Sequence, residues 1–100
     1  MKIKVMRHKV TTWRNIEGKV VNIEYEYTIA VRRFGMWRNL RLYPGRIDKE
    51  DVVSRCLCSK VVVFSYEGKG IRYATKFDNE ADAIQVKLDI MQHPDKYVKS

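Results

Sequence analysis

The most regular feature of the sequence is an alternation of apolar and polar residues between positions 21 and 31. The apolar positions share one parity: Val21, Ile23, Tyr25, Tyr27, Ile29 and Val31. Of the residues between them, only Ala30 is apolar. Successive side chains of a β-strand point to opposite faces, so the pattern predicts one strand with a buried face and a solvent-facing one. At about 3.3 Å per residue this strand would span roughly 36 Å, which is long for a small domain.

A first strand is predicted over residues 2–12. Its apolar positions change parity after Val5, which is typical of a β-bulge or of a strand whose halves face different layers. The sequence of residues 13–18 predicts a turn that leads into the long strand. Within that turn, Asn15 and Gly18 are the residues best able to adopt positive φ.

A tight reversal at Gly35 predicts a third strand over residues 36–43, which the following Pro-Gly pair ends. Residues 47–57 then predict a short helix, because apolar residues recur there at helical spacing. Asp48 is placed to cap the free amides at the start of this helix.

Two apolar runs of strand length follow, at residues 61–66 and 71–77, with a glycine-containing hairpin turn at 67–70. A final helix is predicted from Asn79 to about Gln92, capped by Asp78 and ended by the His-Pro pair that follows. The predicted fold is therefore α+β: an antiparallel sheet of four or five strands with two helices, in the order β-β-β-α-β-β-α.

The final helix has two apolar sides. Ala81, Ile84, Leu88 and Met91 gather on one side, and Ala83, Val86 and Ile90 gather on nearly the opposite one. A helix that lies on a sheet needs only one apolar face. The second group, Ala83, Val86 and Ile90, would pack within the chain, or it would form an oligomer or partner face in a homodimer.

Length and composition predict a single domain over residues 1–100, with residues 94–100 as a loosely held tail. No apolar run is long enough to span a membrane, and the charged start has no signal-peptide centre, so a cytoplasmic location is expected. Cys56 and Cys58 are too close for a structural disulfide and too few for a zinc site, which predicts reduced thiols.

The formal net charge of +8 is unevenly distributed. Residues 1–60 hold fourteen Lys or Arg and six Asp or Glu, whereas residues 61–100 hold six of each. Two segments without any acid carry much of the excess, one at residues 2–14 and one at residues 28–46. Concentrated positive charge on a small protein attracts polyanions, so the partner is expected to be nucleic acid or an acidic protein.

The second segment combines arginine with aromatic residues. Arginine grips phosphate through paired hydrogen bonds, and exposed rings stack on unpaired bases. The candidate nucleic-acid-binding residues are Arg32, Arg33, Phe34, Trp37, Arg38, Arg41, Tyr43 and Arg46 here, and Lys2, Lys4, Arg7 and Lys9 in the first segment. No predicted helix has a basic face for the major groove, so RNA is favoured over duplex DNA. Whether the two segments share a face depends on the strand register, which the sequence leaves open.

Other interpretations remain at this point. Trp37, Leu40 and Leu42 would be core residues if the arginines merely solvate an edge strand. An inhibitor or adaptor that docks its basic surface on an acidic protein, such as a host defence or toxin component, is the alternative function.

Catalysis has little support in the sequence. It holds two histidines and none of the nucleophile, phosphate-loop or metalloprotease motifs. Glu24 and Glu26 share a strand face, yet they are better explained by pairing with Lys or Arg across the sheet than by metal binding. We therefore expect a non-enzymatic protein with no cofactor and no metal.

The arginine-aromatic segment Arg32–Arg38 and the helix start Phe77–Ala83 give the chain a family resemblance. In these stretches it resembles the small basic accessory proteins of tailed bacteriophages, which act in host takeover or against host defence. The resemblance implies binding of host enzymes, RNA or defence factors, and hence a viral protein in the host cytoplasm. It assigns no role to any single residue.

Overall fold

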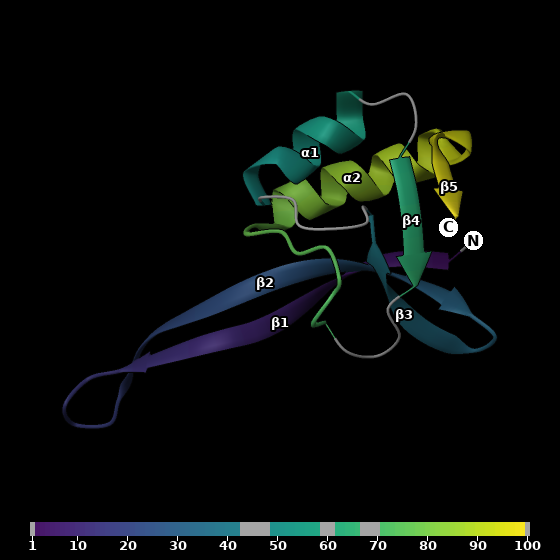
Figure 1. The fold of residues 1–100 in the computed structure, drawn as a ribbon. Coiled ribbons are helices and arrows are strands. Elements are labelled where there is room, and N and C mark those ends of the chain that lie inside the picture. The colour runs from purple at the N-terminus through teal and green to yellow at the C-terminus, as the bar shows by residue number, and fades with distance from the viewer. Residues whose placement is uncertain (1, 43–48, 59–61, 67–70, 100) are drawn as a thin grey trace.

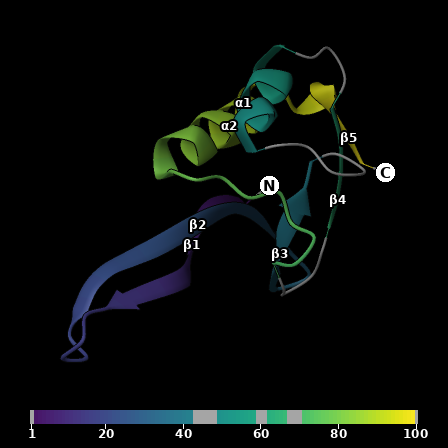
Figure 2. The same cartoon turned by 60° about the vertical axis from the view of Figure 1, so that its left-hand side comes forward.

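The computed structural model describes residues 2–42, 49–58, 62–66 and 71–99. Its strands are β1 (Lys2–Arg14), β2 (Val20–Arg33), β3 (Met36–Arg41), β4 (Val62–Tyr66) and β5 (Tyr97–Lys99), and its helices are α1 (Lys49–Cys58), α2 (Glu80–Gln92) and the 3-10 helix η1 (Pro94–Lys96). This is the predicted α+β class, and α1 and α2 lie on the same side of the sheet (Figures 1 and 2). No helix in the described ranges is both long and apolar enough to cross a membrane.

The three strands β1, β2 and β3 form an antiparallel sheet with β2 in the centre. The end of β3 pairs with β4, where Leu40 lies opposite Tyr66, and β4 pairs in parallel with β5. The irregularity predicted for β1 is a register shift at Val10, further along the strand than the change of parity after Val5. One extra residue there turns the following side chains to the other face.

Two turns connect these strands. In the first, Oδ1 of Asn15 accepts hydrogen bonds from two backbone N–H groups of the turn, and Gly18 adopts a φ of 82°. The prediction of positive φ is thus confirmed for Gly18, whereas Asn15 contributes through its side chain. In the second, Phe34 and Gly35 have φ angles of 52° and 77°, which gives the tight reversal predicted at Gly35.

The core lies between the helices and the face of the sheet that carries the odd-numbered residues of β2. Ile29 and Val31 are buried there as the alternation predicts. The other members of the core cluster are Leu40, Leu42, Val52, Cys56, Phe77, Ala83, Val86, Ile90 and Tyr97. Both cysteines are free, and Cys56 is buried while Cys58 is exposed.

Of the two alternatives for the second apolar side of α2, packing within the chain is confirmed and the oligomer or partner face is wrong. Ala83, Val86 and Ile90 are buried inside this chain, so they cannot meet a second molecule. They are the face that packs on the sheet, where the small Ala83 and the β-branched Val86 and Ile90 fit close to the strands. The opposite group is the solvent-facing one, and its large members Ile84, Leu88 and Met91 are exposed.

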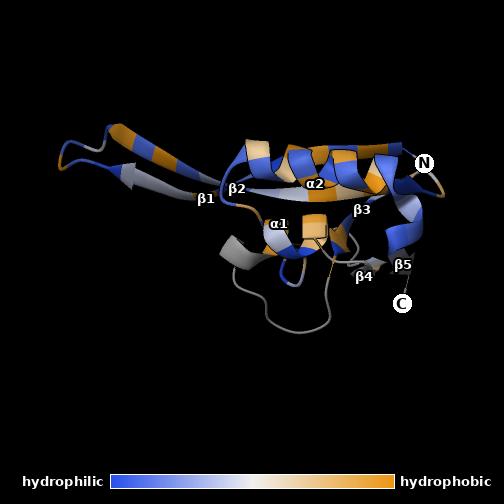
Figure 3. Cartoon of the chain, turned by 90° about the horizontal axis from the view of Figure 1, so that it is seen from above, coloured by the Kyte–Doolittle hydropathy of each residue, from blue (hydrophilic) through white to orange (hydrophobic). Residues whose placement is uncertain are grey.

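The outer halves of β1 and β2 form a two-stranded arm that extends beyond both helices (Figures 1 and 3). Hydrophobic and hydrophilic residues alternate along the β2 strand of this arm in Figure 3. In the described ranges no helix covers the arm (Figure 1), and Val21 is 62% exposed there. Trp13 and Ile16 are exposed as well. The buried face predicted for residues 21–31 is therefore confined to the half of β2 beneath the helices.

The strand predicted at residues 71–77 is not formed. The hairpin turn predicted before it, at residues 67–70, lies outside the described residues. Residues 71–77 instead cross the sheet edge as irregular chain. The backbones of Phe77 and Tyr27 exchange two hydrogen bonds, of 2.8 and 2.9 Å. Leu42 N–H donates to Oγ1 of Thr75 at 2.8 Å. The segment fails as a strand because it takes its backbone partners from two separate places.

The helix ends agree only in part with the prediction. Asn79, and not Asp78, caps α2, since its side chain accepts a hydrogen bond from Asp82 N–H at 2.9 Å. The proposed cap of α1, Asp48, lies outside the described residues. The loosely held tail is a further error, because residues 94–96 form η1 and Tyr97 is buried at the start of β5.

Candidate functional site

A row of basic and aromatic residues crosses the face of the sheet that points away from the helices. Lys2 lies directly opposite Arg32, and Arg32 lies directly opposite Trp37. Directly paired residues project from the same face, so the three side chains stand side by side on β1, β2 and β3. Nζ of Lys4 lies 4.1 Å from the centre of the Trp37 ring. We call these four residues the basic face: Lys2, Lys4, Arg32 and Trp37.

Among the described residues, no acid forms an ion pair with the cations of the basic face, Lys2, Lys4 and Arg32. Lys2 and Arg32 are exposed, and Trp37 is half-buried with Lys4 above its ring. The face therefore presents cations beside a partly accessible indole.

The sign of the charge changes along β2. Glu24 and Glu26 follow the same strand parity as Arg32, and Glu26 lies opposite His8. With Val10, Tyr25 and Asp78 they line a shallow hollow at the base of the arm. No group of three metal-ligating side chains occurs in the described ranges. The acidic end thus limits the basic face to the end of the sheet near the β2–β3 turn.

The other predicted residues of the β2–β3 hairpin do not all join the basic face. Arg38 lies opposite Val31, and Arg33 lies opposite Met36, so both arginines stand on the face that the helices cover. Arg41 has the parity of Trp37 and is half-buried. Tyr43 and Arg46 fall outside the described residues.

Two residues of the first basic segment also lie elsewhere. Arg7 and Lys9 are paired with Tyr27 and Tyr25, on the face opposite to Lys2 and Lys4. The guanidinium carbon of Arg7 lies 4.4 Å from the centre of the Tyr25 ring. The two segments therefore share the sheet, as the predicted turn requires, but only Lys2 and Lys4 share the face of Arg32.

At the tip of the hairpin, a second arginine-aromatic group is formed. The guanidinium carbon of Arg33 lies 5.4 Å from the centre of the Phe34 ring and 5.1 Å from that of Tyr66. Phe34 is 90% exposed. Sequence reasoning missed Tyr66, because its proximity to Arg33 depends on the pairing of β4 with β3, for which the sequence carries no signal.

A buried polar chain supports the basic face from within the sheet. The Thr28 hydroxyl donates to Oδ1 of Asn39 at 2.8 Å, and it lies 2.8 Å from Nε2 of His8. A hydroxyl has one hydrogen, so Nε2 of His8 must be the donor in the second bond. Burial lowers the pKa of His8, an effect that the charge of Glu26 partly offsets. The lowered pKa favours the neutral form of His8 at pH 7, so His8 adds little to the positive field.

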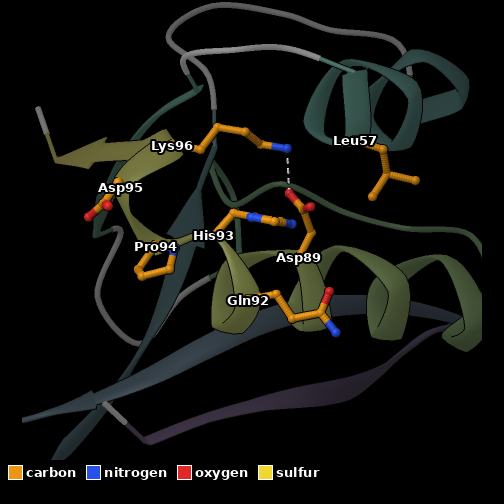
Figure 4. A pocket seen from close by; sticks show the side chains of 7 residues that line it. All are labelled: Leu57, Asp89, Gln92, His93, Pro94, Asp95 and Lys96. Atoms are coloured by element: carbon orange, nitrogen blue, oxygen red, sulfur yellow. Dashed lines mark ion pairs between the residues drawn. The ribbon is translucent and has the colours of Figure 1, made fainter.

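The hollow between α1 and η1, drawn in Figure 4, is a structural junction. Leu57, Gln92, His93, Pro94 and Asp95 line it, together with an ion pair of Asp89 and Lys96. Oδ2 of Asp89 lies 2.6 Å from Nζ of Lys96 and accepts a hydrogen bond of 2.5 Å from the hydroxyl of Tyr97. Lys96 and Tyr97 both contact the same carboxylate oxygen, so the role of Asp89 is to anchor the C-terminal segment.

Replacing Asp89 with asparagine should destabilise the protein by about 1–3 kcal/mol at pH 7, since a charged acceptor is lost. Burial raises the pKa of Asp89, but the hydrogen bonds from Lys96 and Tyr97 outweigh it, so the pKa lies below its usual value. The stability that a lowered carboxyl pKa contributes is present at neutral pH and is lost as the pH falls through that pKa. Urea unfolding at pH 7 and at pH 3 should show a smaller difference in stability between the two proteins at the lower pH. A difference that is unchanged there would contradict the assignment.

Comparisons with protein-family models, with curated proteins and with solved structures find no match to this chain.

Proposed function

We propose that this protein binds single-stranded nucleic acid, with RNA as the favoured ligand, through the basic face and without catalysis. The observation that carries the proposal is the row of Lys2, Arg32 and Trp37 across three strands, with its cations unpaired in the described ranges. A sheet face that combines cations with an aromatic ring suits a strand of unstacked bases.

Each residue of the face has a distinct role in this proposal. Arg32 lies in the middle of the row and binds phosphate with its planar fork, and Lys2 neutralises a neighbouring phosphate. Lys4 covers the Trp37 ring in the free protein. On binding, the ammonium group of Lys4 moves to a phosphate and the ring becomes available to a base. The acids Glu24 and Glu26 repel the strand from the base of the arm and so fix where it ends.

A salt titration tests this proposal. A fluorescently labelled uridine decamer should bind with micromolar affinity at about 50 mM salt and more weakly at about 200 mM. The three cations of the basic face are expected to contribute about −2 to the slope of log affinity against log salt, at about −0.7 per phosphate contact on a single strand. A duplex DNA of equal length, whose bases are stacked, is the control and should bind more weakly. Absence of saturable binding at the lower salt would reject the proposal.

The second candidate function is an adaptor or inhibitor that docks on an acidic protein. The exposed apolar residues of the arm favour it, since Trp13, Ile16 and Val21 provide contacts that a polyanion does not need. Loss of every interaction after nuclease treatment of a lysate favours the nucleic-acid proposal. Retention of one acidic protein on the intact chain, but not on a variant with Trp13→Thr and Ile16→Asn, favours the adaptor.

A further inference from the structure

The turn between β2 and β3 holds a bulky side chain in a backbone conformation that disfavours it. Phe34 and Gly35 both have positive φ, at 52° and 77°. Two such residues in succession make the hairpin turn in which asparagine, aspartate or glycine normally occupies the first position. A phenylalanine there is strained, because its Cβ is crowded by the backbone.

The strain is not offset by burial. The Phe34 side chain is 90% exposed, so folding removes almost none of it from water. A Cβ placed on Gly35 would meet no atom within 4 Å, which shows that the space beside the turn is open. A strained residue with its ring in water gains nothing for the fold, and such positions recur at binding sites.

The Phe34 ring lies close to a cation that also lies close to a second aromatic ring. The guanidinium of Arg33 lies between Phe34 and Tyr66, at 5.4 and 5.1 Å from the two ring centres. Tyr66 is in turn held edge-on against Phe64, with ring centres 5.9 Å apart. Arg33 forms no ion pair in the described ranges. The hairpin therefore presents a cation close to an exposed aromatic ring.

We infer that Phe34 is a stacking platform for one unpaired nucleobase, with Arg33 binding the phosphate next to that base. This inference rests on the proposed function and extends it from the basic face to the tip of the hairpin. The charge favours a base over an apolar pocket of a protein, because such a pocket would also desolvate the adjacent guanidinium. A nucleotide places an anion within reach of Arg33 and a flat π-surface on Phe34.

The variant Phe34→Asn separates binding from folding. Asparagine is favoured at this position of the turn, so the melting temperature should rise by a few degrees. Loss of one stacked base should weaken the affinity for the uridine decamer about 5- to 100-fold. The salt slope should not change, because no phosphate contact is removed. Phe34→Tyr keeps the ring and should restore the affinity.

Two further readouts decide the inference. A decamer that carries 2-aminopurine should lose fluorescence on binding to the wild type, through stacking, and keep it with Phe34→Asn. Heparin, which has charge but no bases, should bind both proteins equally. If the decamer binds the wild type and Phe34→Asn with equal affinity, or if heparin binding falls in parallel, the platform is rejected while the proposed function stands. If the wild type binds no RNA, the proposed function and the platform fail together.

Discussion

Replacement of Phe77 by alanine is expected to destabilise the protein by about 3–5 kcal/mol, a large part of the 5–15 kcal/mol typical of a small domain. Phe77 is 1% exposed and belongs to the core cluster beneath α2. Its backbone is fixed by two hydrogen bonds to Tyr27, so the chain cannot collapse into the space that the ring leaves. The resulting cavity would lie where the segment before α2 meets β2.

Urea unfolding followed by circular dichroism measures this loss. Tyr73→Ala is the matched control, because Tyr73 lies in the same segment and is 57% exposed. The control should change the free energy of unfolding by about 0.5 kcal/mol or less. Equal losses from the two variants would mean that the segment does not anchor the core through Phe77.

Exchange of Lys2 and Arg32 for glutamate is expected to weaken binding of the uridine decamer about 100-fold. Each lost phosphate contact accounts for about tenfold, or about 1.4 kcal/mol, near the lower end of the roughly 1.5–3 kcal/mol that a hydrogen bond to a charged group contributes. The two residues face each other across β1 and β2, so both exchanges fall on one spot of the basic face. Two glutamates there also repel the incoming phosphates.

The control variant has the same change in net charge at two positions outside the basic face. Lys19 lies at the end of the arm and Lys87 lies on α2, so Lys19→Glu with Lys87→Glu alters the charge by the same amount away from the basic face. The control should lose only a few-fold in affinity, through the weaker long-range field. Opposed glutamates destabilise a strand pair, so the neutral pair Lys2→Gln and Arg32→Gln serves as a second variant. If the control and the test variants lost the same affinity for the decamer, the basic face would not be a specific binding site.

The sequence predicts the long strand and the parity of its buried side chains, because both follow from local periodicity. The alternation along residues 21–31 correctly assigns Ile29 and Val31 to the core. It cannot show how much of that face is covered, since this depends on where the helices end. Val21 has the same parity and is exposed on the arm.

The arrangement of the basic face depends on the strand register, which could not be predicted from the sequence. The composition identified the arginines, the lysines and Trp37, but not which of them share a face. That arrangement depends on the lengths of two turns and on one extra residue at Val10. A shift of a single residue would have moved Lys2 and Lys4 to the helix side.

Tertiary contacts also decided features that local patterns left open. The two apolar sides of α2 are similar in sequence, and contact with the sheet selected the one with Ala83, Val86 and Ile90. Residues 71–77 have the composition of a strand, yet their backbone pairs with β2 and β3 at isolated points. In both cases the deciding partner lies far away in the chain.

The most direct test of the basic face is the salt dependence of RNA binding in the wild type and in the Lys2→Gln, Arg32→Gln pair. If both side chains contact phosphate, the slope of log affinity against log salt should become shallower by about 1.4, at about 0.7 for each contact removed. An unchanged slope, whatever the affinity, would mean that no phosphate is bound at Lys2 and Arg32 and would contradict the account.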